Sequence, residues 1–237
     1  MRRLVLALCL AALGPAGAPE AQETLVFNID TRPGSEQYGM VRAYAEAICA
    51  HAGFQCRFLS LPLERAVELM RAGKLDGEFG RVREFAEAKG LTDSYLLIDY
   101  PFVPADIFVL TPADQPSIGD WSTLTGRKRR VGYLRGTYYY EHKLAAPDSL
   151  AVGVPLDSTG QCPRMLVTRR VEACLTDGWS WGVDFQDLIE QGAIRRGPSL
   201  EMVESYLFLN TSRASFAPLF LAAMAAAKMQ TAATPTQ

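Results

Sequence analysis

Four cysteines in this 237-residue chain could form covalent cross-links. A fifth, Cys9, lies in an apolar run at the N-terminus. In an oxidising compartment an even number of cysteines predicts disulfides, and four cysteines allow three pairings. We favour the two local pairs, because each lies within one expected helix–strand unit. The predicted disulfides are Cys49–Cys56 and Cys162–Cys174.

The chain has only two histidines, His51 and His142, and its cysteine spacings are not Cys-x-x-Cys. Tetrahedral zinc sites draw on closely spaced cysteine and histidine ligands, so we expect no metal. The sequence also contains no P-loop and no nucleophile elbow. These residues predict neither a cofactor nor a nucleophilic enzyme.

The first 21 residues have the three-part pattern of a secretory signal peptide. Met1-Arg2-Arg3 is positively charged, residues 4–13 are apolar, and small residues follow up to Ala18. We place the cleavage after Ala18 or Ala21. The apolar run is too short to span a membrane, and charges interrupt every later one. We therefore expect an exported protein in the periplasm without stable membrane insertion.

Composition is that of a globular protein with a sizeable core: 49% of residues are hydrophobic and 21% are charged. The formal net charge is -2, and the one dense basic run covers residues 127–130. We interpret that run as a solvated turn. Nucleic-acid binding needs a wider basic face, so it is not expected.

Apolar periodicity predicts two successive α/β units. The first alternates strands and helices over residues 25–29, 38–51, 54–61, 63–73 and 75–79. The second alternates them over residues 105–110, 130–134, 136–144, 151–155, 159–169 and 171–175. A strand over 202–209 and a helix over 216–229 follow. A βαβ order favours parallel sheets with helices on their faces.

Three segments then resemble, in order, the family 3 extracellular solute-binding proteins, which are the amino-acid-type periplasmic receptors of ABC importers. They are Leu75-Asp76-Gly77, residues 124–137 around Val131-Gly132-Tyr133-Leu134-Arg135-Gly136-Thr137, and Asp157-Ser158-Thr159 with Arg170-Val171-Glu172-Ala173. The resemblance covers nearly the whole mature chain.

The resemblance implies the type II periplasmic binding protein fold. Two α/β lobes, each with a parallel-core sheet and flanking helices, are joined by a two-strand hinge. Lobe 1 would hold residues 22–104 and 200–237, and lobe 2 would hold residues 105–199. The ligand would bind between the lobes, which close by a hinge motion. The implied partners are a small-molecule ligand and an ABC permease, and we expect a monomer.

Asp30 ends the first predicted strand, where the family often places an acidic residue facing the ligand; a turn-capping role is an equal alternative. The family's aromatic–proline platform is missing from the following loop. Arg32 or Tyr38 could replace it, although Tyr38 could equally be a half-buried residue at a helix start.

The segment after the third strand departs from the family, whose hydroxyl-rich stretch ends in an arginine that grips a ligand carboxylate. Here it contains Glu78, Arg81 and Arg83. A guanidinium matches two carboxylate oxygens, and in an extended segment both arginines would face the same way. The alternative is a surface pair matched by Glu84 and Glu87.

Arg135, Gly136 and Thr137 form a strand-to-helix turn whose N–H groups could hold an anion. In the family this turn contacts the acidic end of the ligand, whereas Thr137 could also cap the helix. One tyrosine of the run 138–140 is expected to line the cleft.

Asp177 resembles the family's aspartate that pairs with an α-amino group. Trp179 and Trp181 lie beside it and could close over a cationic or apolar ligand, although packing is an alternative for Trp181.

The resulting prediction is a solute-binding protein for a small polar molecule, amino-acid-like or a small carboxylate. The alternatives are a periplasmic dehydratase that uses Glu78 or Asp177 as acid or base, and an accessory or sensing module.

Overall fold

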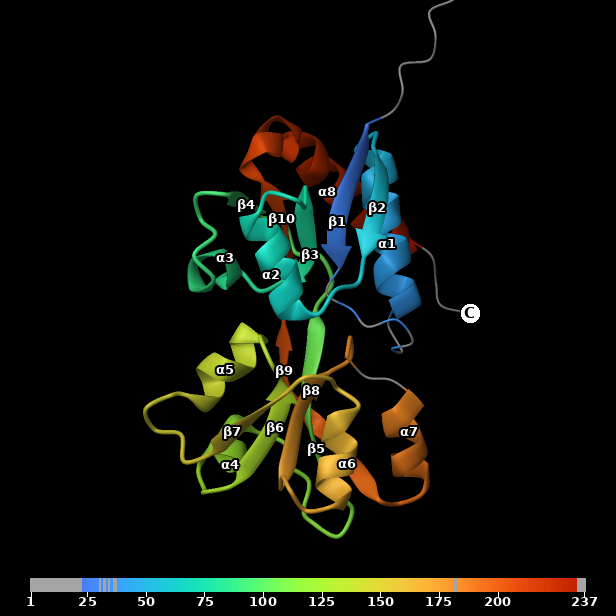
Figure 1. The fold of residues 1–237 in the computed structure, drawn as a ribbon. Coiled ribbons are helices and arrows are strands. Elements are labelled where there is room, and N and C mark those ends of the chain that lie inside the picture. The colour runs from blue at the N-terminus through green and yellow to red at the C-terminus, as the bar shows by residue number, and fades with distance from the viewer. Residues whose placement is uncertain are drawn as a thin grey trace, which may run out of the picture.

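The computed structural model of the protein describes residues 23–29, 31, 33, 35, 38–180 and 183–233. The predicted signal peptide, Asp30, Arg32 and Trp181 lie outside this range. Two five-stranded sheets lie one above the other, and each has helices on both faces (Figure 1).

The first sheet has the strand order β2-β1-β3-β10-β4. Strand β1 lies between β2 and β3 and runs parallel to both, whereas β10 is antiparallel to β3 and β4. The strands are β1 (Thr24–Ile29), β2 (Gln55–Leu59), β3 (Gly77–Arg81), β4 (Tyr95–Ile98) and β10 (Tyr206–Asn210). The helices are α1 (Tyr38–His51), α2 (Leu63–Arg71), α3 (Phe85–Ala88) and α8 (Ala217–Ala233). Buried residues of α1 and α8 share one hydrophobic core, and those of α2 and α3 share another.

The second sheet has the order β7-β6-β8-β5-β9, with β6 parallel to β7 and β8 and with β5 antiparallel to β8 and β9. The strands are β5 (Ala105–Pro112), β6 (Arg130–Leu134), β7 (Val152–Leu156), β8 (Ala173–Asp177) and β9 (Ile194–Val203). The helices are α4 (Trp121–Thr125), α5 (Tyr138–Leu144), α6 (Gln161–Val167) and α7 (Val183–Glu190). A 3-10 helix, η1 (Thr211–Phe216), precedes α8.

The chain crosses between the two sheets twice, before β5 and after β9, and the two crossings are hydrogen-bonded to each other. The N–H of Phe102 donates to the carbonyl of Ser205 at 2.8 Å, and the Ser205 hydroxyl donates to the carbonyl of Val103 at 2.6 Å. The predicted fold class, two α/β lobes joined by a two-strand hinge, is therefore confirmed.

These crossings also explain where the predicted elements were wrong. The single strand expected over 202–209 is two strands, β9 and β10, because Ser205 bonds across the hinge. The β9 strand reaches Val203, so the predicted lobe limit at residue 199 falls inside a strand of the second sheet. The limits of the lobes stay a prediction.

Both local disulfides are present. Cys49–Cys56 joins the last turns of α1 to β2, with 6.1 Å between the Cα atoms, and Cys162–Cys174 joins α6 to β8, with 6.0 Å. A Cβ atom on Gly132 would lie 2.7 Å from the Cys162 sulfur, so β6 can pass this disulfide only with a glycine there. Each disulfide cross-links elements of one lobe.

Over the described residues, no helix is both long and apolar enough to cross a bilayer. The same part of the chain holds no group of three or more histidine, cysteine or acidic side chains placed to bind a metal.

Candidate functional site

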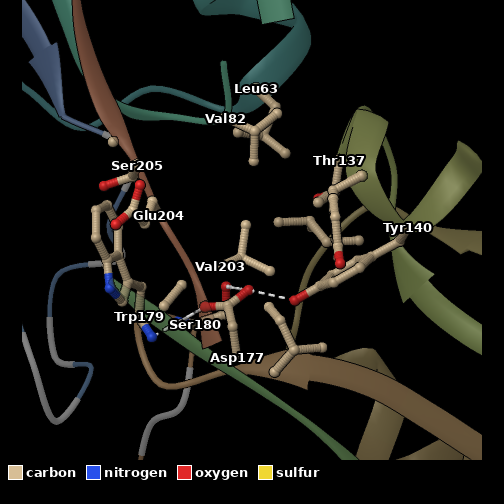
Figure 2. A pocket seen from close by; sticks show the side chains of 15 residues that line it. Leu63, Val82, Thr137, Tyr140, Asp177, Trp179, Ser180, Val203, Glu204 and Ser205 are labelled. Atoms are coloured by element: carbon tan, nitrogen blue, oxygen red, sulfur yellow. Dashed lines mark hydrogen bonds between the residues drawn. The ribbon is translucent and has the colours of Figure 1, made fainter. Parts of the chain in front are cut away.

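A cavity lies where the two lobes meet the hinge, and we call it the inner cavity (Figure 2). Its volume is about 70 Å³. Both lobes contribute side chains, and so does the hinge crossing after β9, through Glu204 and Ser205. It is lined by Leu63, Gly80, Val82, Ala105, Ile107, Leu134, Thr137, Tyr139, Tyr140, Asp177, Trp179, Ser180, Val203, Glu204 and Ser205.

A larger cavity of about 430 Å³, the outer cavity, adjoins the inner one. The two share Leu63, Leu134 and Ser180 in their walls. The outer cavity is otherwise lined by Thr31, Pro33, Ser60, Leu61, Pro62, Glu64, Arg135, Asp157, Ser158 and Thr159. Together the two have the size of a small-molecule site.

Asp177, the last residue of β8, lines the inner cavity and lies at its bottom as drawn in Figure 2. Its Oδ2 accepts from the Tyr140 hydroxyl at 2.5 Å, and its Oδ1 accepts from the N–H groups of Trp179 and Ser180 at 2.9 and 2.8 Å. Desolvation by the surrounding protein raises the pKa of Asp177, and these hydrogen bonds offset only part of that effect. An ionised carboxylate here favours a cationic group in the cavity.

Trp179 lines the inner cavity at the hinge. Its indole N–H donates to the carbonyl of Pro104 at 3.3 Å, and its ring packs edge-on against Phe102, with the centroids 6.0 Å apart. Only 4% of Trp179 is exposed. The residue therefore joins the core of the first lobe to the second lobe beside the predicted site.

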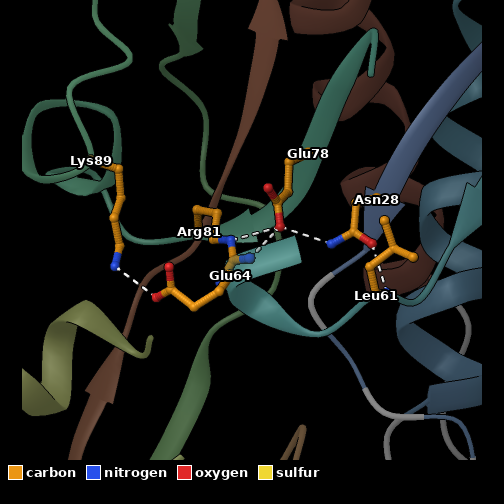
Figure 3. A network of polar contacts seen from close by, with 6 residues as sticks. All are labelled: Asn28, Leu61, Glu64, Glu78, Arg81 and Lys89. Atoms are coloured by element: carbon orange, nitrogen blue, oxygen red, sulfur yellow. Dashed lines mark hydrogen bonds and ion pairs between the residues drawn. The ribbon is translucent and has the colours of Figure 1, made fainter. Parts of the chain in front are cut away.

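Glu78 and Arg81 pair with each other inside the first lobe (Figure 3). The Arg81 Nε donates to Glu78 Oε1 at 2.8 Å, and Arg81 also contacts the same oxygen through Nη2. Glu78 is fully buried and Arg81 is 5% exposed. Asn28 donates to the same carboxylate oxygen at 2.8 Å, and its carbonyl accepts from the N–H of Leu61 at 3.0 Å. The network thus fixes the segment that leads into α2.

Neither Glu78 nor Arg81 is among the residues that line the inner or the outer cavity. Arg83 points elsewhere, donating to Asp99 at 2.5 Å and to the Tyr206 hydroxyl at 3.1 Å. The expectation that the two arginines face the same way is wrong, because β3 ends at Arg81 and the extended backbone does not continue to Arg83.

The predicted turn of residues 135–137 lies in the cleft, where Arg135 lines the outer cavity and Thr137 lines the inner one. Gly136 has a φ of +84°, and a Cβ there would lie 3.2 Å from the Cβ of Leu63 at the start of α2. The two lobes therefore touch at this glycine. Arg135 donates to Asp157 at 2.9 Å. Thr137 precedes α5 without a capping hydrogen bond from its side chain.

Of the remaining residues that the sequence predicted at the site, the structure describes only Tyr38. Tyr38 is half-buried at the first residue of α1, and its hydroxyl accepts from Arg42 at 3.0 Å. It lines neither cavity, which fits the helix-start alternative. Asp30, Arg32 and Trp181 lie outside the described residues. Ligand contact by any of these residues stays a prediction.

Sequence reasoning did not find the hinge residues Glu204 and Ser205 or the α2 residue Leu63 as cavity residues. For Glu204 and Ser205 the only signal was their position next to the hinge, between the ends of β9 and β10. Of the tyrosine run, Tyr139 and Tyr140 both line the inner cavity, and Tyr140 is 2% exposed.

No protein-family model matches the sequence. A curated relative from Shewanella oneidensis, described as an uncharacterized protein, is 27% identical over 97 residues. The match covers 39% of this chain and 36% of the relative, so the chain spans about a third of that relative's length.

Solved structures match over most of the chain. An ancestral arginine-binding protein bound to glutamine has a TM-score of 0.65 at 17% identity, covering 89% of this chain and 94% of its own. An amino acid ABC transporter substrate-binding protein from Streptococcus pneumoniae bound to L-arginine has a TM-score of 0.63 at 13% identity, covering 87% and 90%. The arginine-binding protein of T. maritima, in its truncated arginine-bound form, has a TM-score of 0.64 at 12% identity, covering 86% and 95%. At these identities the likeness shows the two-lobed fold.

Proposed function

We propose that this protein is a solute-binding protein that closes its two lobes on a small polar molecule bearing an amino group. The observation that carries the proposal is Asp177, a carboxylate placed by four hydrogen bonds at the bottom of a cavity that both lobes line. A ligand that contacts both lobes at once favours the closed state, which is how such a hinge is driven.

The place of the protein in the cell forms part of the same proposal. The N-terminal pattern, the two disulfides and the fold together support export to the periplasm, membership of solute-binding protein family 3 and delivery of the ligand to an ABC importer. The structural relatives described as arginine-binding and as substrate-binding proteins of amino acid ABC transporters support the same role.

Binding is favoured over catalysis by the state of the two carboxylates that the dehydratase alternative would use. Glu78 is buried in an ion pair outside the cavities, and Asp177 is held by four donors. An acid or base must reach the proton that it transfers, and Glu78 faces neither cavity. The structural relatives are described as binding proteins.

Calorimetric titration of the mature chain against a library of amino acids and amines tests the proposal. A ligand present at about 100 times its Kd adds roughly 2.7 kcal/mol to the free energy of unfolding, so a thermal-shift screen can find candidates first. A bound ligand that mass spectrometry recovers unchanged is the expected result. Conversion of the hit into a product would contradict the proposal.

The Asp177→Asn variant locates the site. Loss of one partner of a desolvated charge pair costs about 2–5 kcal/mol, so we expect affinity to fall by roughly 30-fold or more. Asp148→Asn, at an exposed position in the second lobe, is the matched control and should bind as the wild type does. Equal affinity of both variants would place the ligand elsewhere.

A further inference from the structure

The arginine that a ligand carboxylate could use in the first lobe is already occupied by a carboxylate of this chain. Arg81 donates to Glu78 through Nε and Nη2, and its guanidinium lies 4.7 Å from the centroid of the Phe85 ring. Both charged side chains are at least nine-tenths buried. A ligand carboxylate would have to displace a buried ion pair to reach Arg81, which is strongly unfavourable.

The strand-to-helix turn of the second lobe is occupied in the same way. The N–H of Gly136 donates to the side-chain carboxylate of Glu141 at 3.0 Å. The N–H groups on either side are also bound, that of Arg135 to the carbonyl of Leu156 at 2.8 Å and that of Thr137 to the carbonyl of Leu134 at 3.2 Å. These three donors of the turn are therefore not available to an anion.

The charged side chains around the two cavities also favour a cationic ligand over an anionic one. Among the described residues that line them, Asp177 and Glu204 are the charged side chains of the inner cavity, and Glu64, Asp157 and Arg135 are those of the outer cavity. Four are acidic and one is basic. Arg135 is bonded to Asp157, and Glu64 is bonded to Lys89 at 3.2 Å. Over the part of its wall that the structure describes, the inner cavity has two acidic side chains and no basic one, which favours a cation.

We propose that the ligand is a small organic cation without a carboxylate: an alkyl amine, diamine or guanidine whose charged end binds Asp177. This inference rests on the proposed function and narrows its ligand class. The methylene stem of such a ligand fits the apolar wall of Leu63, Val82 and Val203. The side chains of Tyr139 and Trp179 also line this cavity, and an aromatic ring can stabilise a bound cation further.

Titration of three matched pairs tests the inference, since the members of each pair differ by one carboxylate. The pairs are L-arginine with agmatine, L-lysine with cadaverine, and L-ornithine with putrescine. We expect the decarboxylated member to bind at least about tenfold more tightly in at least one pair, with that binding lost in Asp177→Asn.

The outcomes separate this inference from the proposed function. If the amino acid of the responding pair binds as tightly as its amine or more tightly, the inference is overturned and the solute-binding role stands. The same holds if only a neutral or anionic solute from the wider library binds. If no compound of the pairs or the library binds, both proposals fail.

The variant Glu141→Ala tests why a ligand that bears a carboxylate binds less tightly than its amine. Glu141→Ala removes the carboxylate that occupies the Gly136 N–H, so an amino acid can bind there. We expect the preference for the amine over the amino acid to fall by about threefold or more. Glu190→Ala, on the exposed side of α7, is the control and should leave the ratio unchanged. An unchanged ratio in Glu141→Ala would overturn the role assigned to Glu141.

Discussion

The Tyr140 hydroxyl donates to Asp177 Oδ2 at 2.5 Å across 37 residues of sequence, which joins α5 to the end of β8 inside the cleft. Tyr140 is 2% exposed, so its position is set by packing in the core of the second lobe. The carboxylate is therefore held in place before any ligand arrives. Pre-organisation of this kind lowers the entropic cost of binding.

The first prediction concerns the stability of the ligand-free protein. Because the pKa of Asp177 is raised in the folded state, the contribution of this group to stability is present at acidic pH, below its unfolded pKa, and is lost as the pH rises through the folded pKa. Asp177→Asn has no carboxyl group to ionise, so the variant does not lose this stability as the pH rises. Its amide oxygen can still accept from the two N–H groups. We expect the variant to have a Tm a few degrees above that of the wild type at pH 7.5.

Urea unfolding at pH 7.5 and near pH 4 measures this effect. The stability difference between Asp177→Asn and the wild type should shrink at the lower pH, because a larger share of the Asp177 carboxyl groups is then protonated in the folded protein and fewer buried charges remain. A variant that is less stable than the wild type at pH 7.5 would contradict the prediction. A residue that costs stability and improves binding is expected at a functional site.

The second prediction concerns the pH dependence of binding. An amine ligand keeps its charge throughout the acidic range, because its pKa is about 10. Its affinity should therefore fall as the pH drops through the raised pKa of Asp177, approaching about tenfold per pH unit below that pKa. Glu204 also lines the inner cavity, so the titration is repeated in Glu204→Gln. Affinity that rises on acidification would be inconsistent with Asp177 as the binding carboxylate.

Much of the fold could be predicted from the sequence, because apolar periodicity is a local property. The helix over 38–51 and the strand over 130–134 were placed as the structure has them. The β9–β10 boundary could not be predicted, since it is set by the bonds of Ser205 to Phe102 and Val103, about a hundred residues earlier. Long-range hydrogen bonds of this kind have no signature in a local pattern.

The candidate site was predictable only in part, for the same reason. Asp177 and Thr137 could be placed near the cleft because the ends of parallel strands meet at one edge of a sheet. The pairing of Arg81 with Glu78 depends on where β3 ends and on Asn28, a residue of the neighbouring strand. Sequence spacing alone could not show that this arginine turns into the lobe.

The third prediction concerns that buried pair. Arg81→Met leaves Glu78 as a buried carboxylate without its charged partner, and such a change costs about 3–5 kcal/mol of unfolding free energy. The double variant Glu78→Gln with Arg81→Met should recover most of the loss. Arg83→Met is the matched control, because Arg83 pairs with Asp99 on the surface and its loss should matter little.

Chemical denaturation of the wild type, Glu78→Gln, Arg81→Met and the double variant gives the coupling between the two residues. A double variant as unstable as Arg81→Met alone would show that Glu78 and Arg81 do not stabilise the lobe as a pair. If the double variant folds, its affinity for a confirmed ligand should stay within about threefold of the wild type, since neither side chain lines a cavity.

The fourth prediction concerns the disulfides. Closing loops of this length contributes about 2–3 kcal/mol each in the chain-entropy description. Replacing both Cys162 and Cys174 by alanine, or both Cys49 and Cys56, should lower the free energy of unfolding by about that amount. Dithiothreitol should lower the Tm of the wild type but not that of a variant with all four replaced. A wild-type Tm that is insensitive to reduction would contradict the prediction.

The fifth prediction concerns closure of the lobes at Gly136. Alanine there would place a Cβ 2.6 Å from Glu64 Oε1 and 3.2 Å from the Cβ of Leu63, both in α2 of the opposite lobe. The glutamate can move aside, but the Cβ of Leu63 is fixed to the helix backbone. Gly136→Ala should therefore hold the lobes apart and weaken ligand binding by about tenfold or more.

The control for Gly136→Ala must reproduce its backbone strain, since a left-handed φ costs a residue with a side chain about 1 kcal/mol. Gly192 has a φ of +68°, belongs to the same lobe, and has open space where a Cβ would lie. Both variants should lose similar stability, whereas only Gly136→Ala should lose affinity. X-ray scattering with saturating ligand should show a smaller decrease in radius of gyration for Gly136→Ala than for Gly192→Ala. Equal affinity and equal compaction in the two variants would mean that the contact between Gly136 and α2 does not limit closure.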